Sequence, residues 1–372
     1  MALIEVLNRK SNKLFHRVAH NVYAGDAQYI FPLESDIDFV FNRNKNAAFK
    51  LGDARRWVML EGERAVGRIA AFYSQKEEGI VGGIGFFECV ENQEYANNLF
   101  DTALNWLDEK GAKICNGPIN FGDRDKFWGL MVEGFHLPTY LENYHKPYYQ
   151  KLFENYGFKP HREQITFRID RSKFDTKRFT KVAEWISRKP GFKFKHFEKN
   201  NAEAFVKDYV EVYNQSLTSN SEFNAISFEE AMRLFKAMKH VLVEEFIWFA
   251  YAQDRPIGVL VVIPDINTVL KPLKGRFNKW NRIRFHFFRR STSIHNLKAM
   301  VIGVAPKFQG FGIDTVLVYK FYKEVVKTDQ YRTAELPRNE AKNQAIMQMM
   351  QNMNAEIFKR HVIYQIEIGK KL

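Results

Sequence analysis

The sequence predicts an α/β protein with mixed sheets, built from two similar domains in tandem. Its 372 residues exceed one ordinary domain and suit two. A hydrophobic fraction of 45% supplies enough apolar residues for real cores. In both halves, the hydrophobic pattern predicts a β-hairpin followed by strand, helix, strand, helix and strand. This internal repeat of element order, with little residue identity behind it, predicts domains over residues 1–170 and 171–372.

The elements of the first half carry local signals. Glu61-Gly62-Glu63 forms the turn of the hairpin over residues 56–73. The helix over residues 95–109 has apolar residues on one face, and Gly111 stops it. The other expected elements are a helix over 12–22, strands over 83–90, 113–117 and 164–169, and a short helix over 147–155.

The second half repeats this order after a charged linker over residues 170–190 that we expect to be helical. Asp254-Arg255-Pro256 forms the turn of a hairpin over residues 247–263. The other expected elements are strands over 192–197, 299–304, 332–336 and 358–367, and helices over 201–217, 227–238, 314–327 and 341–353.

A glycine loop joins the strand over residues 299–304 to the helix over 314–327. Pro306 ends the strand, because proline has no N–H to donate to a sheet. Gln309-Gly310-Phe311-Gly312-Ile313-Asp314 then leads directly into the helix. Glycines let the backbone approach a ligand, and the first-turn amides and the helix dipole favour an anion. The pattern therefore predicts a phosphate-binding loop, and an ordinary glycine turn capped by Asp314 is the alternative.

This loop resembles the coenzyme A loop of the GNAT superfamily of N-acetyltransferases, Q/R-x-x-G-x-G/A. Gln309 fills the first place and Gly312 the fourth, but Asp314 stands where a glycine or alanine is expected. The element order of both halves also resembles the GNAT fold. Further stretches resemble an uncharacterised bacterial family of double-GNAT proteins: Val66-Gly67-Arg68-Ile69-Ala70-Ala71, Gly117-Pro118-Ile119-Asn120-Phe121 with Gly129-Leu130 and Gly134-Phe135, Pro147-Tyr148-Tyr149 with Gly157-Phe158, and Pro264-Asp265-Ile266-Asn267.

The resemblance implies acetyl-CoA or another acyl-CoA as the donor substrate, bound by the second domain. The backbone of residues 302–304 would pair with the pantetheine amides, and the amides of residues 309–313 would hold the pyrophosphate. The first half reads Glu91-Asn92-Gln93-Glu94 at the equivalent place, and these acids would repel a diphosphate. The expected coenzyme-binding residues are therefore Ile302, Val304, Gln309, Gly310, Phe311, Gly312, Ile313 and, on the last helix, Asn343.

A GNAT reaction also needs a base for the amine and an acid for the leaving thiolate. Many members supply the acid from a tyrosine on the final helix, and the matching position here is Met350, which cannot donate a proton. Glu335, on the strand after the coenzyme helix, is the candidate base, with a surface or turn carboxylate as the alternative. Asp265 is expected to cap a turn. Tyr148 and Tyr149 are expected in the aromatic core or beside a cleft.

The segment of residues 271–290, which we call the basic-aromatic segment, holds eight Lys and Arg, five aromatic residues of the Phe and Trp type, and no Asp or Glu. It carries much of the net charge of +13. Three interpretations stay open: a helical insertion that packs its aromatics on the second domain, a helix that lies on an anionic membrane surface, or a site for an acidic acyl carrier or nucleic acid. We expect no nucleic-acid partner, because the charge is confined to one segment.

Two functional hypotheses follow. The first is a cytoplasmic N-acyltransferase that moves an acyl group from acyl-CoA to a small-molecule or peptide amine, and the second is a non-catalytic GNAT-fold protein that binds a ligand or an anionic surface. The cytoplasm is expected because no signal peptide or run of ~18–20 apolar residues is present. Cys89 and Cys115 are expected as buried thiols, and scattered histidines predict no metal site.

Overall fold

The computed structural model describes residues 1–77, 79–124, 126–174, 176–217, 225–341, 347, 350–351 and 353–369. Its contacts divide the chain into two units. Unit 1 holds Met1–Ile165, Asn267–Ser291 and Lys359–Leu372, and unit 2 holds Thr166–Ile266 and Thr292–Phe358. The basic-aromatic segment therefore clusters with unit 1. Strands β7 (Lys159–Asp170) and β14 (Glu356–Glu367) each contribute residues to both units.

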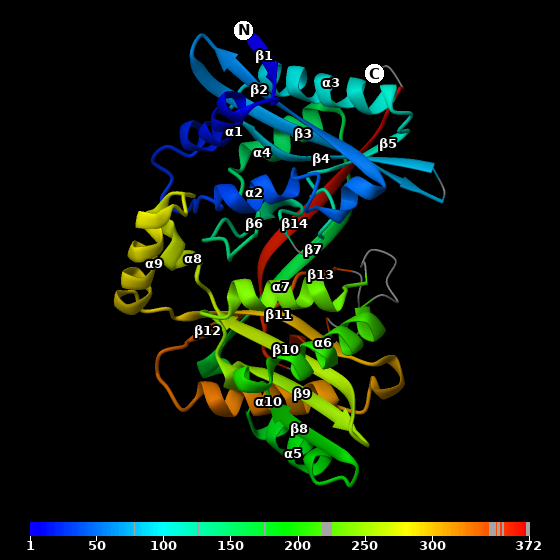
Figure 1. The fold of residues 1–372 in the computed structure, drawn as a ribbon, viewed down its shortest axis with the longest axis vertical. Coiled ribbons are helices and arrows are strands. Elements are labelled where there is room, and N and C mark those ends of the chain that lie inside the picture. Colours follow the sequence, from blue (N-terminus) through cyan, green and yellow to red (C-terminus); the bar gives the residue numbers. More distant parts are fainter. Residues whose placement is uncertain are drawn as a thin grey trace. The chain divides into compact units, whose positions relative to one another are not determined.

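Unit 1 is a mixed sheet covered by helices (Figure 1). Strands β1 to β4 pair antiparallel, β4 is parallel to β5, and β5 is antiparallel to β14. Its elements, besides β7 and β14, are β1 (Ala2–Glu5), α1 (Arg9–Val22), α2 (Glu34–Val40), β2 (Gly52–Glu61), β3 (Arg64–Lys76), β4 (Gly79–Cys89), α3 (Gln93–Glu109), β5 (Ile114–Gly117), β6 (Leu130–Glu133), α4 (Tyr148–Tyr156), α8 (Asn267–Leu270) and α9 (Lys279–Ser291).

Helices α1 and α3 cover opposite faces of the unit 1 sheet. Successive residues of a strand point to opposite faces. Gly67 of β3 faces Leu99 of α3, whereas the neighbouring Arg68 donates from Nη1 to the carbonyl of Phe15 in α1 at 3.0 Å. The apolar residues of both helices and of the strands form the core of this unit.

Unit 2 repeats the same pattern of pairing. Strands β8 to β11 pair antiparallel, β11 is parallel to β12, and β12 is antiparallel to the end of β7. Its other elements are α5 (Thr176–Ser187), β8 (Phe192–His196), α6 (Ala202–Leu217), α7 (Phe228–Met238), β9 (Ile247–Ala252), β10 (Arg255–Pro264), β11 (Asn296–Val304), α10 (Ile313–Val325), β12 (Thr333–Glu335) and β13 (Asn339–Glu340).

Helices also cover both faces of the unit 2 sheet. Val259 of β10 belongs to a core with residues of α6, and a side chain at the preceding Gly258 would meet Ile313 and Leu317 of α10. Helix α10 contacts β9, β10, β11 and α5, while α6 contacts β10 and β11 (Figure 1). The glycine loop therefore enters the layer that α5 and α10 form.

The predicted α/β class, the mixed sheets and the repeated element order are confirmed. Residues 170–190 contain the expected helix, α5. Most of the expected helix over residues 341–353, with Asn343, lies outside the described residues. Cys89 and Cys115 are buried free thiols, and burial raises the pKa of Cys89 to about 12. In the described part of the chain, no helix has the length and apolar character needed to cross a bilayer.

Candidate coenzyme loop and carboxylate cluster

The glycine loop begins with a side-chain contact that fixes its first turn. After β11, the short 3-10 helix η6 (Pro306–Phe308) turns the chain, and Gln309 donates from Nε2 to the carbonyl oxygen of Val304 at 3.0 Å. Gln309 therefore ties the loop back to the end of its own strand. Gln309, Gly310 and Phe311 are exposed, so a ligand in solvent can reach the loop.

Two glycines give the loop its path. Gly310 and Gly312 both have φ of +76°, in the left-handed region that glycine adopts without strain. A Cβ atom at Gly310 would meet nothing within 4 Å, whereas one at Gly312 would lie 2.5 Å from Cδ1 of Ile186 in α5. The space around Gly310 is open, and the backbone at Gly312 packs against a helix.

Helix α10 starts at Gly312 without a side-chain cap. Among the described residues, the amides of Ile313 and Asp314 have no hydrogen-bond acceptor. The corresponding helix of unit 1, α3, differs in its cap residue, because Oδ1 of Asn92 caps it by accepting from the amide of Tyr95 at 3.0 Å; among the described residues, the amides of Gln93 and Glu94 also have no acceptor. Uncapped first-turn amides with the helix dipole behind them form an anion-binding site.

The suggestion that Asp314 caps this helix is wrong. The cap residue is Gly312, and Asp314 lies in the first turn, where its Oδ1 accepts from the amide of Thr315 at 2.9 Å. The positive φ of Gly312 starts the helix two residues before the aspartate. The carboxylate occupies one first-turn amide and brings a negative charge to the helix N-terminus, where it competes with a bound anion.

Strands β11 and β12 pair over only three residues. Their register runs from Asn296 with Thr333 to Lys298 with Glu335, while β11 continues six residues further, to Val304. A cavity of about 120 Å³ lies beside this parting. Mostly apolar side chains line this cavity, and they come from the end of β7, from β10, β11, α10 and β12, and from the segment with Met350. They include Leu297, Ile302, Phe321, Leu336 and Met350. Ile302 and Met350 therefore belong to the wall of an apolar cavity inside unit 2.

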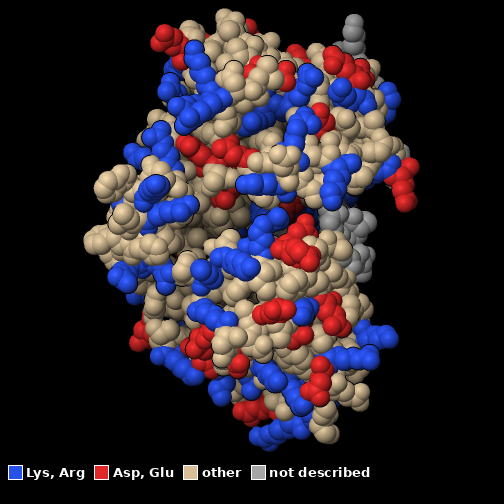
Figure 2. Space-filling model, in the orientation of Figure 1, with Lys and Arg blue, Asp and Glu red and all other residues tan. Residues whose placement is uncertain are grey.

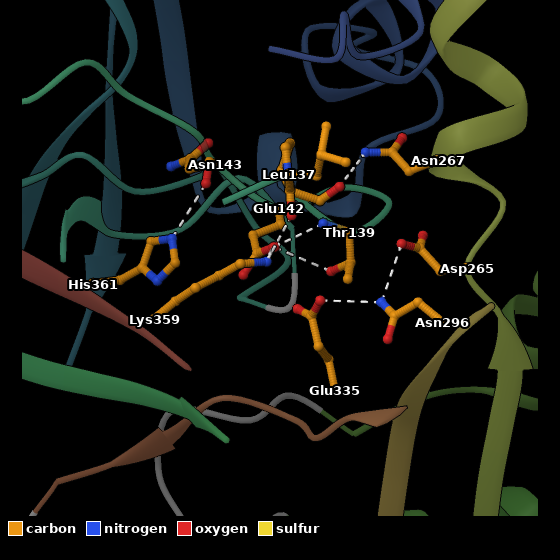
Figure 3. A network of polar contacts seen from close by, with 11 residues as sticks. Leu137, Thr139, Glu142, Asn143, Asp265, Asn267, Asn296, Glu335, Lys359 and His361 are labelled. Carbon is orange, nitrogen blue, oxygen red and sulfur yellow. Dashed lines mark hydrogen bonds and ion pairs between the residues drawn. The ribbon is translucent and has the colours of Figure 1, made fainter. Parts of the chain in front are cut away.

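Glu335 belongs to a buried group of polar side chains that we call the carboxylate cluster (Figure 3). Its Oε1 accepts from Nδ2 of Asn296 at 3.0 Å, and the same nitrogen lies 3.5 Å from Oδ2 of Asp265. Oδ1 of Asn296 accepts from the hydroxyl of Thr333 at 2.9 Å. Asp265 and Glu335 are each 5% exposed. Two carboxylates thus share one amide donor at the point where β11 and β12 part.

Sequence reasoning named both carboxylates but missed Asn296, which bridges them. A lone asparagine at the start of a strand has no distinguishing pattern in the sequence. Its role comes from the pairing of β11 with β12, which sets Asn296 opposite Thr333, and from the amide of Asp265, which donates to its carbonyl at 3.0 Å.

In unit 1, the two tyrosines after Pro147 are structural. Tyr149 is fully buried and donates to Oε2 of Glu88 at 2.6 Å, and Tyr148 donates to the carbonyl of Cys89 at 2.7 Å. The Arg68 guanidinium lies 3.6 Å from Oε1 of Glu88. Burial raises the pKa of Glu88 against the opposing effect of Arg68. Tyr149 therefore belongs to the core, not to an open cleft.

A second buried ion pair in unit 1 connects β14 to residues 137–142. Nζ of Lys359 donates to Oε2 of Glu142 at 2.8 Å and to the carbonyl of Leu137 at 2.9 Å (Figure 3). Glu142 also accepts from the amide and the hydroxyl of Thr139. These bonds satisfy a lysine with no exposed surface, which would otherwise be costly to bury.

Comparison with known proteins gives distant relatives that span the whole chain. No family model matches it. It is 22% identical over 377 residues to "Bacterial ceramide synthase" of Caulobacter vibrioides, covering 98% of this chain and 97% of the relative. It is 20% identical over 376 residues to "Protein YghO" of Escherichia coli, covering 97% and 94%. Among solved structures, a tandem GNAT protein from the clavulanic acid biosynthesis pathway superposes with a TM-score of 0.60 at 12% identity, covering all of both chains.

These likenesses establish the class of structure. The chain has a tandem GNAT fold, as the element order and the loop predicted. In this fold, the loop from Gln309 to Ile313 stands between β11 and α10, the place where the coenzyme loop was expected.

Proposed function

We propose that the protein is a GNAT-type N-acyltransferase that uses unit 2 to bind an acyl-CoA donor. The uncapped N-terminus of α10 carries this proposal. Its amides at Ile313 and Asp314 suit a diphosphate and follow two left-handed glycines, whereas the start of α3 in unit 1 has an asparagine cap between Glu91 and Glu94. The exposed loop from Gln309 to Phe311 leaves room for the nucleotide part of the donor.

We propose that the cavity of unit 2 holds the acyl group or the pantetheine arm of the donor, which would enter between β11 and β12. Its lining is mostly apolar, and its volume of about 120 Å³ lies beside the unpaired part of β11. We propose that the backbone of Ile302 and Val304 pairs with the pantetheine amides there, although the Val304 carbonyl already accepts from Gln309. A carbonyl oxygen has two lone pairs, so this contact leaves one acceptor position.

For the acceptor, we propose the amine of a long-chain amino alcohol. The likeness to a protein named as a bacterial ceramide synthase supports this choice, since a ceramide is the amide of a fatty acid with such an amine. The donor would then be a long-chain acyl-CoA and not only acetyl-CoA. Small-molecule and peptide amines remain the comparison substrates.

In the proposed reaction, the amine nitrogen attacks the thioester carbonyl, a C–N bond forms, and the C–S bond breaks to release coenzyme A. Glu335 is proposed to take the proton that the amine loses, because its buried carboxylate lies at the end of the β11–β12 pairing. Asn296 would hold that carboxylate in place through its 3.0 Å bond. Met350 offers no proton for the thiolate, so water is proposed to supply it.

Ligand binding and turnover test the proposal separately. We expect coenzyme A and acyl-CoA to raise the midpoint of thermal unfolding, since a ligand that binds only the native state stabilises it. Gly310→Asp should abolish this rise and Gly310→Asn should retain it. Both side chains accept the left-handed conformation and have open space, so they differ mainly in charge. An equal loss in both variants would contradict the loop assignment.

Turnover is then measured as release of the coenzyme A thiol with palmitoyl-CoA or acetyl-CoA and a panel of amines. Amide formed from a long-chain amino alcohol would support the proposed acceptor. A thermal rise without turnover on any amine would instead favour the non-catalytic alternative, which the Asp314 carboxylate and the Met350 side chain already favour.

A further inference from the structure

Helix α9, within the basic-aromatic segment, exposes a stripe of large apolar side chains. Trp280 is 77% exposed, Ile283 64% and Phe287 67%. Their spacing of three and then four residues places them on one face of the helix. We call these three residues the exposed stripe. Isolated exposed apolar residues are ordinary, but a row of three on one short helix is a contiguous apolar surface.

The opposite face of α9 is buried and is tied to the loop that precedes the helix. Phe285 and Asn281 are buried, and Nδ2 of Asn281 donates to the carbonyl of Arg276 at 2.8 Å. Oδ1 of Asn278 accepts from the amide of Asn281 at 2.9 Å and closes the first turn. Because these contacts set the rotation of the helix, the exposed stripe cannot turn inward without breaking them.

The segment before α9 is fixed in the same way. The amide of Glu34 donates to the carbonyl of Gly275 at 2.8 Å, and Nζ of Lys271 donates to the carbonyl of Ala27 at 2.6 Å. Gly275 has φ of +78°, and a Cβ there would lie 2.8 Å from the carbonyl oxygen of Pro32. The segment that leads into α9 is thus held against the rest of unit 1 by a backbone contact at Gly275 and a side-chain contact from Lys271.

Positive charge surrounds the exposed stripe. The basic-aromatic segment has eight Lys and Arg and no acid. At 100° per residue, Lys279 and Arg290 lie on one side of the stripe, and Arg284 lies on the other. In Figure 2, Lys and Arg side chains lie among uncharged residues over α9, at the left edge of the view. Apolar residues flanked by Lys and Arg are typical of helices that lie in the interface of an anionic bilayer.

We propose that α9 binds the surface of an anionic membrane, with Trp280, Ile283 and Phe287 inserted among the lipid headgroups. The three side chains would bury their apolar surface at the boundary of the acyl chains, and the flanking cations would contact phosphate groups. Thirteen residues of helix lie along the interface without spanning it. This inference is independent of the acyl-transfer chemistry.

A bilayer fits this surface better than an acidic protein partner. Tryptophan prefers the headgroup level because its ring is largely apolar and carries a polar N–H, and phenylalanine is typical of the apolar face of interfacial helices. The stripe lies on one face of a single helix and has Lys or Arg on both sides, the arrangement that suits a helix lying on an anionic bilayer. A second copy of the chain and an acidic carrier protein are distinct outcomes of the test below.

The test uses co-flotation of the full-length protein with vesicles of phosphatidylcholine alone or mixed with phosphatidylglycerol. We expect flotation only with the mixed vesicles, and its loss at high salt. Replacing Trp280, Ile283 and Phe287 together with serine should reduce vesicle binding by more than about tenfold. The matched control replaces three equally exposed apolar residues elsewhere, Leu7, Leu51 and Trp185, and should bind like the unchanged protein.

Tryptophan fluorescence gives a second readout. In a Trp185→Phe variant, the other highly exposed tryptophan is removed; Trp57, Trp106 and Trp248 are buried, and Trp128 is half-buried. Brominated lipid should then quench a blue-shifted signal that disappears in Trp280→Phe.

Four results would overturn the proposal. The first three are failure to float at low salt, flotation of the stripe variant at the level of its control, and a protein dimer that the stripe variant converts to a monomer without lipid. Such a dimer would assign the stripe to a second copy. Competition by an acidic carrier protein that abolishes flotation without vesicle damage would assign it to that partner. Circular dichroism of both triple variants shows whether they fold alike.

Discussion

Replacing Gly312 with alanine tests the geometry of the coenzyme loop, and Gly310 provides its control. Both glycines have φ of +76°, so an alanine at either position has the same conformational cost, about 1–2 kcal/mol. Only at Gly312 does the new Cβ meet a neighbour, Cδ1 of Ile186 at 2.5 Å. That atom ends a flexible side chain, and moving it from its rotamer adds about 1 kcal/mol. We therefore expect Gly312→Ala to be more destabilising than Gly310→Ala by about 1 kcal/mol.

A double-mutant cycle isolates this contact. Ile186→Val removes the atom that the new Cβ would strike, at a cost of about 0.5–1.5 kcal/mol by itself. In the double variant the clash is absent. The losses of unfolding free energy in the two single variants should therefore add up to about 1 kcal/mol more than the loss measured for the double variant. The free energy of unfolding comes from urea titration, with the slope checked for constancy across the variants.

The reasoning fails in either of two cases. Equal losses for Gly310→Ala and Gly312→Ala would mean that α5 does not pack on the loop as the structure places it. A coupling smaller than about 0.3–0.5 kcal/mol would be within ordinary additivity and would remove Ile186 as the cause. Thermal titration with coenzyme A on the same proteins shows whether loop strain also lowers ligand affinity.

Three further predictions follow from the described contacts. Asp314→Asn should tighten coenzyme A binding about two- to fivefold at low salt, because a negative charge leaves the N-terminus of α10, and unchanged or weaker affinity in calorimetry would contradict this. Glu335→Gln should lower kcat about 10²–10⁴-fold and flatten the acidic limb of the profile of kcat against pH, because the proposed base is lost. Asp265→Asn should keep that limb. Identical profiles for the two variants would exclude Glu335 as the base. Burial lowers the pKa of His145 to about 3, and its Nδ1 accepts from the amide of Met131, so the folded protein holds this ring neutral. Between pH 6.5 and 3 the ring is protonated in the unfolded chain but not in the folded one. The free energy of unfolding should therefore fall as the pH falls through this range, by up to about 1.4 kcal/mol per pH unit. His145→Asn should reduce this slope in urea titrations, and an unchanged slope would assign it to other groups.

Local signals in the sequence predicted most of the fold. Gly62 and Asp254 marked hairpins that the structure contains, and the glycine loop lies between β11 and α10 as its pattern indicated. Helix α10 begins at Ile313, one residue before its predicted start at Asp314, because the cap residue is Gly312 with its left-handed backbone. Positive φ at one glycine among several cannot be read from residue types alone.

Local sequence patterns did not predict the contacts between distant segments. The bridge that Asn296 makes between Asp265 and Glu335 depends on the register of β11 with β12. A helical insertion was one of the interpretations of the basic-aromatic segment, but the sequence did not predict that Gly275 would contact Glu34, that Lys271 would contact Ala27, or that Trp280 would lie in solvent. In both cases the partners are at least 31 residues apart, and only the folded chain brings them together.

The division of the chain between its units sets an order for its synthesis. The chain passes from one unit to the other at four points, after Ile165, Ile266, Ser291 and Phe358. Strand β5 of unit 1 pairs with β14 near Tyr364 and Ile366, which a ribosome makes long after β5. Until those residues emerge, β5 presents an open edge, the kind of surface through which nascent chains associate. Release of a fragment ending at residue 170 would leave that edge permanently bare, so the two halves should be produced as one polypeptide.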